Sequence, residues 1–231
     1  MVYLIPTVLS EGGTACLPAY ILDAVKACTV FFVENERTAR RFLKSIWREM
    51  VIDDYEWFTI KETMPETKAA FLQKLKEGKT IGIISEAGCP GVADPGQALV
   101  LLAQQKGVKV KPLVGPNSIL LALMASGMNG QRFQFVGYLP IDGAQRAKAI
   151  KDLEAEAMQK NCTQIFIETP YRNNQLLETL LKTCHPQTQL CLAVDITSEA
   201  EAIQTKTVQQ WKTNVPHLHK RPVIFLLYLP G

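Results

Sequence analysis

Short apolar runs alternate with helical segments along nearly the whole chain, and this alternation restricts the fold more than any other feature. Apolar residues recur at helical spacing in 17–28 and on one face of 36–49, and each segment adjoins a short apolar run. The expected strands lie at 2–5, 29–33, 80–85, 108–114, 133–137, 163–168, 189–195 and 223–229. The expected helices lie at 17–28, 36–49, 66–77, 95–107, 116–127, 146–158 and 173–184. Such alternation predicts an α/β fold with mostly parallel sheets covered on both faces.

The length and the repeat of the pattern indicate two domains. The chain has 231 residues, which allows one large domain or two small ones. The pattern of strand and helix starts again after residue 130, so we expect an N-terminal α/β domain at 1–114 and a C-terminal one at 115–231. No linker rich in Ser or Pro separates them. We therefore expect the halves to pack closely and form a cleft.

Charge and cysteine usage exclude several classes of protein. The formal net charge is +3, which is low for a dedicated nucleic-acid binder, so any such contact must be local. The six cysteines form no CxxC pair, and we expect reduced thiols and no metal site. His217 and His219 are more typical of an exposed loop than of ligands. Because no secretory signal and no apolar run of about 20 residues is present, we expect a cytoplasmic protein without a membrane span.

The loop 85–96 is the strongest candidate for a ligand site. It holds three glycines and two prolines in twelve residues after a buried strand, where open α/β sheets bind ligands. Glu86 and Asp94 offer carboxylates there, although Asp94 is equally well explained as the N-cap of a helix starting at Pro95. The chain has no GxxxxGK[ST], no GxGxxG after a strand and no GxSxG. Nucleotide hydrolysis, classical NAD binding and a histidine-based triad therefore lose their main support.

Four runs of sequence resemble one known family in the same order. They are VENERTARRFLK at 33–44, SEAGCPGVADPG at 85–96, VGPNSILLALMASGMNGQRFQFVGYLP from 114 and IFIETPYRNNQLLETL from 165. They resemble the tetrapyrrole methylase superfamily, and within it they are most similar to the bacterial small-subunit ribosomal RNA 2'-O-ribose methyltransferase branch. That branch reads close to SDAGTPGISDPG in the loop and ESPHR near residue 168. The likeness covers about residues 30–215.

The resemblance implies two α/β/α domains that hold S-adenosylmethionine in the cleft between them, in a homodimer. Position by position, it implies contacts with this cofactor that are made mainly by the backbone. The corresponding residues are Ser85, Glu86, Ala87, Gly88, Asn117, Ser118, Phe166, Ile167, Glu168, Pro222 and Val223.

Methyl transfer from a sulfonium needs no metal, because the donor already carries the activating charge and the protein mainly aligns the reactants. A ribose hydroxyl must also lose its proton to a group within hydrogen-bond reach. The candidates in the matching motifs are Glu34, Arg37, Glu86, Asp94, Glu168 and Arg172. None of them is favoured as the base at this point, and an arginine is better suited to bind phosphate.

Several positions depart from the branch. The first strand leads into PTVLSEGGT instead of a motif like TPIGNLGD, and Glu86 stands where Asp is usual. The stretch 193–202 lacks an Arg, a Lys and a His that the branch carries there, which weakens the case for gripping RNA phosphates. The cations on 36–49, with Arg146, Lys148 and Lys151, could bind RNA, although a solvated helix face is the commoner explanation.

Three functions stay open on this reading. The first is ribose methylation of small-subunit ribosomal RNA. The second is methylation of a tetrapyrrole or another small molecule, and the third is a non-catalytic protein that binds S-adenosylmethionine or regulates another activity.

Overall fold

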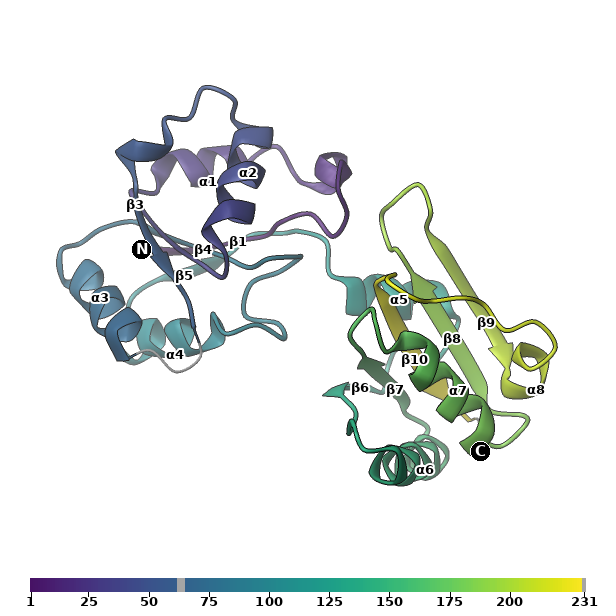
Figure 1. Ribbon diagram of the computed structural model, residues 1–231. Coiled ribbons are helices and arrows are strands. Elements are labelled where there is room, and N and C mark those ends of the chain that lie inside the picture. The colour runs from purple at the N-terminus through teal and green to yellow at the C-terminus, as the bar shows by residue number, and fades with distance from the viewer. Residues whose placement is uncertain (62–64, 230–231) are drawn as a thin grey trace. The chain divides into compact units, whose positions relative to one another are not determined.

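The computed structural model describes residues 1–61 and 65–229 and consists of two compact units, Met1–Asn117 and Ser118–Gly231 (Figure 1). Each unit has its own sheet and core. The domains predicted from the sequence, 1–114 and 115–231, differ by a few residues from these units. Within the described part of the chain, no helix is long and apolar enough to cross a membrane.

The sheet of the first unit is parallel throughout. Its strands are β1 (Val2–Ile5), β2 (Val30–Val33), β3 (Glu56–Thr59), β4 (Ile81–Ile84) and β5 (Val110–Pro112), in the order β3-β2-β4-β1-β5. The helices are α1 (Ile21–Ala27), α2 (Glu36–Ile46), α3 (Pro65–Lys76) and α4 (Gln97–Gln105), with short 3₁₀ turns at Gly13–Cys16 and Ile52–Asp54. All four residues of β2 and of β4 are buried, as expected for central strands of a covered parallel sheet.

The helices cover both faces of this sheet, as the alternation along β2 shows. Phe31 packs into a cluster with residues of α1 and α2, whereas Phe32 packs into a second cluster with residues of α3 and α4. Gly82 in β4 leaves room for this packing, because a Cβ there would lie 2.8 Å from side-chain atoms of both Ile5 and Phe31. Because all five strands are parallel, their carboxyl ends lie at one edge of the sheet, where open α/β sheets bind ligands.

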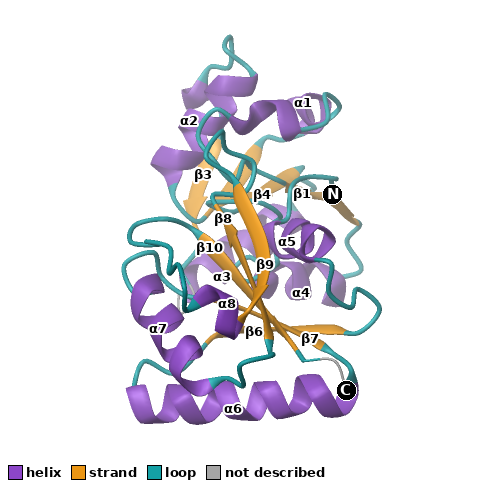
Figure 2. Cartoon of the chain, turned by 90° about the vertical axis from the view of Figure 1, so that its right-hand side faces the viewer, coloured by secondary structure: helices purple, strands orange, loops and turns teal. Residues whose placement is uncertain are grey.

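The second unit has a mixed sheet. Its elements are α5 (Ser118–Ser126), β6 (Phe133–Tyr138), α6 (Gly143–Lys160), β7 (Thr163–Ile167), α7 (Asn173–Thr183), β8 (Gln189–Val194), β9 (Ala202–Thr207), α8 (Val208–Trp211) and β10 (Val223–Tyr228). The order is β6-β7-β10-β8-β9, and among the described strands β6 and β7 form the one parallel pair. Figure 2 shows the strands of this sheet in orange beside α6, α7 and α8.

The expectation of mostly parallel sheets thus holds for the first sheet and needs correction for the second. The connection between β8 and β9 is too short to contain a crossover helix, which makes that pair antiparallel, and β10 lies between β7 and β8 and runs antiparallel to both. The core of this unit lies between the sheet and α6, α7 and α8. At its centre the rings of Phe166 and Phe225 stack at 5.8 Å between centroids.

Candidate functional site

Three loops of the first unit meet at the carboxyl edge of its sheet. They follow β1, β4 and β5, at 6–13, 85–96 and 113–117. The amide of Thr7 donates to the carbonyl of Gly88 at 2.9 Å. Gly88 itself has φ +71°, and a Cβ there would lie 3.0 Å from Leu9 Cδ2 and 3.1 Å from the carbonyl oxygen of Pro116. A glycine at 88 therefore lets the three loops pack against one another.

Glu34 connects the end of β2 to the loop after β4. Its Oε2 accepts a hydrogen bond of 2.7 Å from the backbone amide of Glu86. Burial raises the pKa of Glu34; the Glu86 amide opposes this rise, and the charges of Asp94 and Glu86 add to it. Glu34 is thus a fixed carboxylate whose protonated form is easier to reach than that of an exposed glutamate.

Asp94 closes the loop 85–96 on itself. Its Oδ1 accepts from the amide of Gly96 and its Oδ2 from the amide of Gly91, both at 2.6 Å. Burial raises the pKa of Asp94, and the two amides oppose that shift. The alternative reading of Asp94 as a helix N-cap needs correction, because α4 begins at Gln97 with Gly96 as its N-cap. Both carboxylate oxygens of Asp94 are therefore used in hydrogen bonds that fix the conformation of the loop.

The loops that follow β1, β4 and β5, together with the end of β2, are acidic. Residues 6–13, 34–35, 85–96 and 113–117 contain Glu11, Glu34, Glu86 and Asp94, and their sequence has no Lys, Arg or His. Such an arrangement attracts a cationic ligand and repels phosphate. The side chains of Glu86 and Ala87 are exposed, so this part of the loop is open to a ligand.

A second set of predicted residues lies in the other unit, at the end of β7. The Glu168 side chain is 1% exposed; its Oε1 accepts from the amide of Thr169 at 2.7 Å and from Arg172 at 2.6 Å. Its Oε2 has no hydrogen-bond partner among the described residues. Burial opposes ionisation of Glu168, but the Arg172 guanidinium and the Thr169 amide outweigh it and hold the pKa below its ordinary value. Glu168 is therefore an ionised, paired group.

Strand pairing brings further predicted residues together at this position. Ile224 pairs with Ile167, so Val223, at the start of β10, lies beside the end of β7. Pro222 precedes it and accepts from the amide of Asp195 at 3.0 Å. Phe166 itself is fully buried within β7.

The remaining predicted residues are placed as follows. Ser85 is buried and its hydroxyl donates to the carbonyl of Gly88 at 3.2 Å. Arg37 is exposed in the first turn of α2. Asn117 ends the first unit and Ser118 begins α5 in the second. The predicted residues thus form one set in each unit.

Several of the basic residues considered for RNA binding are paired or buried within the chain. Arg40 pairs with Glu36 at 2.8 Å and lies over the Trp57 ring, and Lys44 donates to the carbonyl of Met50 at 2.9 Å. Arg146 is 2% exposed and cannot belong to a solvated face. It lies on the buried face of α6 together with Ile150 and Ala157.

The contact at Gly88 gives a testable prediction. Gly88→Ala and Gly91→Ala each place a side chain at positive φ, which costs about 1–2 kcal/mol of folding free energy. A Cβ at Gly91 meets nothing within 4 Å, so only the Gly88 variant also crowds neighbouring loops, at a further ~1 kcal/mol or more. Urea denaturation of the two variants measures the difference. Equal losses would contradict the tight packing of the three loops.

Comparison with known proteins agrees with the motifs. The profile of the family Tetrapyrrole (Corrin/Porphyrin) Methylases matches residues 12–211. Ribosomal RNA small subunit methyltransferase I of Vibrio cholerae is 32% identical over 205 residues, which are 88% of this chain and 67% of that protein. The protein of the same name from Escherichia coli O157:H7 is 30% identical over 202 residues, 87% of this chain and 67% of that one. The chain thus spans about two thirds of the length of these relatives.

Solved structures share the fold at low sequence identity. The methyltransferase CobJ superposes with a TM-score of 0.63 at 16% identity, over 99% of this chain and 98% of that one. A uroporphyrin-III C-methyltransferase from Thermus thermophilus, complexed with S-adenosyl homocysteine, superposes with a TM-score of 0.58 at 16% identity, over 98% and 96%. The resemblance found in the motifs is thereby confirmed at the level of the family. The chain belongs to the tetrapyrrole (corrin/porphyrin) methylase family, a family of S-adenosylmethionine-dependent methyltransferases.

Proposed function

We propose that this protein binds S-adenosylmethionine at the acidic loops of its first unit and methylates a ribose 2'-hydroxyl of small-subunit ribosomal RNA. The observation that carries the cofactor part is the set of ordered loops after β1, β4 and β5, which together with Glu34 hold four carboxylates and no Lys, Arg or His in their sequence. S-adenosylmethionine carries a positive sulfonium and a positive ammonium group, which suit such an edge. The exposed backbone at Glu86 and Ala87 suits contacts with its polar groups.

When bound, the cofactor supplies a methyl group on a positive sulfur that leaves as a neutral thioether. The residues of the chain have to bind it, orient it and take up the proton of the acceptor. Of the six candidate residues, Asp94 uses both oxygens in the loop, and Glu168 is paired with Arg172. Arginines stay protonated.

Glu34 is therefore the candidate we favour for the proton acceptor. Its Oε2 is fixed by the Glu86 amide, and burial raises its pKa, which makes it a stronger base than an exposed carboxylate. Glu86 is the alternative, because its exposed carboxylate lies on the same loop. We propose that Glu86 instead attracts the cation of the cofactor.

The ribosomal RNA acceptor is supported by the names of the relatives that align over most of this chain. It is tested by mapping 2'-O-methylation of small-subunit ribosomal RNA in cells lacking the gene. We expect one ribose methylation to disappear and to return when the gene is restored. An unchanged map would contradict the RNA acceptor.

A small-molecule acceptor is the second candidate. It is favoured by the acidic edge, which repels phosphate, and by the likeness in fold to the uroporphyrin-III C-methyltransferase. Production of S-adenosylhomocysteine with a porphyrinogen, but not with small-subunit RNA, would support it. Production with either acceptor would contradict the third hypothesis, a non-catalytic binding protein.

We further propose that the protein is a homodimer, as the family resemblance implies. We also propose that it is cytoplasmic, where a ribosomal RNA acceptor would be found. Light scattering on the purified chain measures the mass. A monomer at micromolar concentration would contradict the homodimer.

A further inference from the structure

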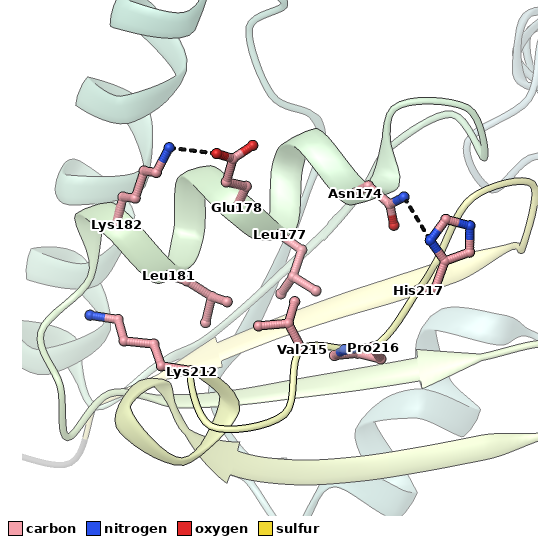
Figure 3. A pocket seen from close by; sticks show the side chains of 9 residues that line it. All are labelled: Asn174, Leu177, Glu178, Leu181, Lys182, Lys212, Val215, Pro216 and His217. Carbon is pink, nitrogen blue, oxygen red and sulfur yellow. Dashed lines mark hydrogen bonds and ion pairs between the residues drawn. The ribbon is translucent and has the colours of Figure 1, made fainter.

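A groove runs between α7 and the segment 212–217 in the second unit (Figure 3). Its volume is about 660 Å³. Leu177 and Leu181 of α7 and Val215 opposite them form its apolar part, and Pro216 continues it. Asn174, Glu178, Lys182, Lys212 and His217 also line it. An apolar hollow with a polar rim is typical of a ligand site.

The charge at the rim is positive. Lys182 pairs with Glu178 at 2.5 Å, which leaves the second lysine of the rim, Lys212, without a neighbouring acid in the lining. The segment 212–221 reads KTNVPHLHKR and contains no Asp or Glu. Within it Arg221 is held by Asp195 at 2.7 Å, whereas Lys212 and Lys220 are exposed. The groove therefore attracts an anion.

The segment is held in place at one end of the groove. Asn174 accepts from the amide of Leu218 at 2.7 Å, and its Nδ2 lies 3.3 Å from Nδ1 of His217. The carbonyl of Pro170 accepts from the amide of Lys220 at 2.9 Å. These bonds fix the basic segment against the start of α7. The rim is thus formed before any ligand binds.

Exposed rings continue the groove beyond His217. The rings of His217 and His219 lie 6.1 Å apart, and those of His219 and Tyr171 lie 5.9 Å apart. Tyr171 is 69% exposed, which is unusual for a large aromatic side chain. Exposed aromatic rings among cations are the features on which the bases of single-stranded nucleic acid stack.

We infer that this groove and its aromatic end bind a single-stranded segment of RNA. A base lies against the apolar wall at Leu177 and Val215, phosphates lie near Lys212 and Lys220, and a further base stacks on Tyr171. A single strand is required because the bases of an RNA duplex cannot enter such a hollow. The inference rests on the proposed RNA acceptor. The groove would supply a cationic RNA contact in 212–221. Such a contact is needed elsewhere in the chain because 193–202 lacks the cations of the related branch and the loops proposed to hold the cofactor are acidic.

The test measures binding directly, without methyl transfer. Fluorescence anisotropy records binding of a labelled single-stranded oligoribonucleotide of mixed sequence to the full chain. The double variant Lys212→Glu, Lys220→Glu is expected to weaken binding by at least about tenfold. It is also expected to lower the slope of log K against log salt by about 1.4, which corresponds to two phosphate contacts. Tyr171→Ala is expected to weaken binding about fivefold or more, fivefold being the low end for loss of one base stack.

The matched control is Lys106→Glu, Lys109→Glu. It makes the same change in net charge on exposed lysines of the first unit that do not line the groove. We expect its affinity to stay within about twofold of the unmodified chain. Equal weakening by both double variants, or a blunt RNA duplex that binds as tightly as the single strand, would overturn the inference.

Cross-linking gives a second measurement. RNA that contains 4-thiouridine is expected to cross-link to the peptide that includes 212–221, and cross-links confined to α2 would overturn the inference.

Light scattering of the Val215→Asp variant is expected to give the same mass as the unmodified chain. A lower mass would mean that the groove binds a second copy of the chain and not RNA. If the groove variants weaken RNA binding but loss of the gene leaves the methylation map unchanged, the proposed function is wrong and the groove inference stands. If loss of the gene changes the map but the groove variants bind RNA normally, the groove inference is wrong and the proposed function stands.

Discussion

Replacement of Glu34 by glutamine is expected to slow methyl transfer by about a hundred- to ten-thousandfold, the range over which general bases contribute. The amide oxygen of glutamine can still accept from the Glu86 amide, which lies 2.7 Å from Glu34 Oε2 in the unmodified chain. The loop is therefore preserved, and only the ability to take a proton and the negative charge are lost. Single-turnover formation of S-adenosylhomocysteine measures the rate, and calorimetry with S-adenosylmethionine measures the affinity.

Two further variants separate the roles of Glu34. Glu34→Ala removes both the base and the anchor of the Glu86 amide, so affinity for the cofactor should fall as well as the rate. Glu49→Gln removes one charge from an exposed glutamate outside these loops and serves as the control, and its rate should stay within about threefold of the unmodified chain. A normal rate for Glu34→Gln would move the role of proton acceptor to another residue, with Glu86 as the next to be tested.

Replacement of Arg172 by alanine is expected to lower the free energy of unfolding by about 2 kcal/mol, less than for a fully buried ion pair because the Arg172 side chain is 32% exposed. Glu168 is 1% exposed at its side chain, and Arg172 donates to it at 2.6 Å. Without the guanidinium, a buried carboxylate keeps one backbone amide and lacks a countercharge. Urea denaturation at neutral pH measures the loss.

The loss should depend on pH in a defined direction. The pKa of Glu168 lies below its ordinary value of 4.5 in the folded chain, so the pair stabilises the fold above that value. This stability disappears as the pH falls through the lower folded pKa. The gap between Arg172→Ala and the unmodified chain should therefore shrink in acid.

Lys182→Ala is the matched control for this variant. It breaks a pair with Glu178 on the same helix, but both side chains are more than 60% exposed. The expected loss is below about 1 kcal/mol. A loss equal to that of Arg172→Ala would show that burial of Glu168 is not what makes its pair important.

The first unit could be predicted closely from the sequence, because its elements have strong local signals. The run Ile81–Ile84 is wholly apolar and is a central strand, and Asn35 caps α2 through bonds to the amides of Arg37 and Thr38. The second unit was harder to predict. Ala202–Thr207 is mostly polar and partly exposed, so β9 has no apolar period to reveal it. The antiparallel direction of β8 and β9 follows from a connection whose length only the structure shows.

The candidate site was predictable where it depends on local composition. The density of Gly and Pro in 85–96 marks the loop after β4. The bond from Glu86 to Glu34 joins residues 52 positions apart, and no local pattern encodes such a contact. The groove on α7 likewise combines residues from 174–182 with residues from 212–217, each an ordinary mixture of polar and apolar side chains.

The hydrogen bond between Glu34 and position 86 uses the backbone of position 86 and not its side chain. Together with the two amides held by Asp94, it fixes the path of the loop independently of the exposed side chains at 86, 87 and 92. These side chains can therefore be replaced without moving the backbone that carries them. A glutamate where the related branch has an aspartate is a change of this kind: the carboxylate moves by one methylene while the path of the loop stays fixed.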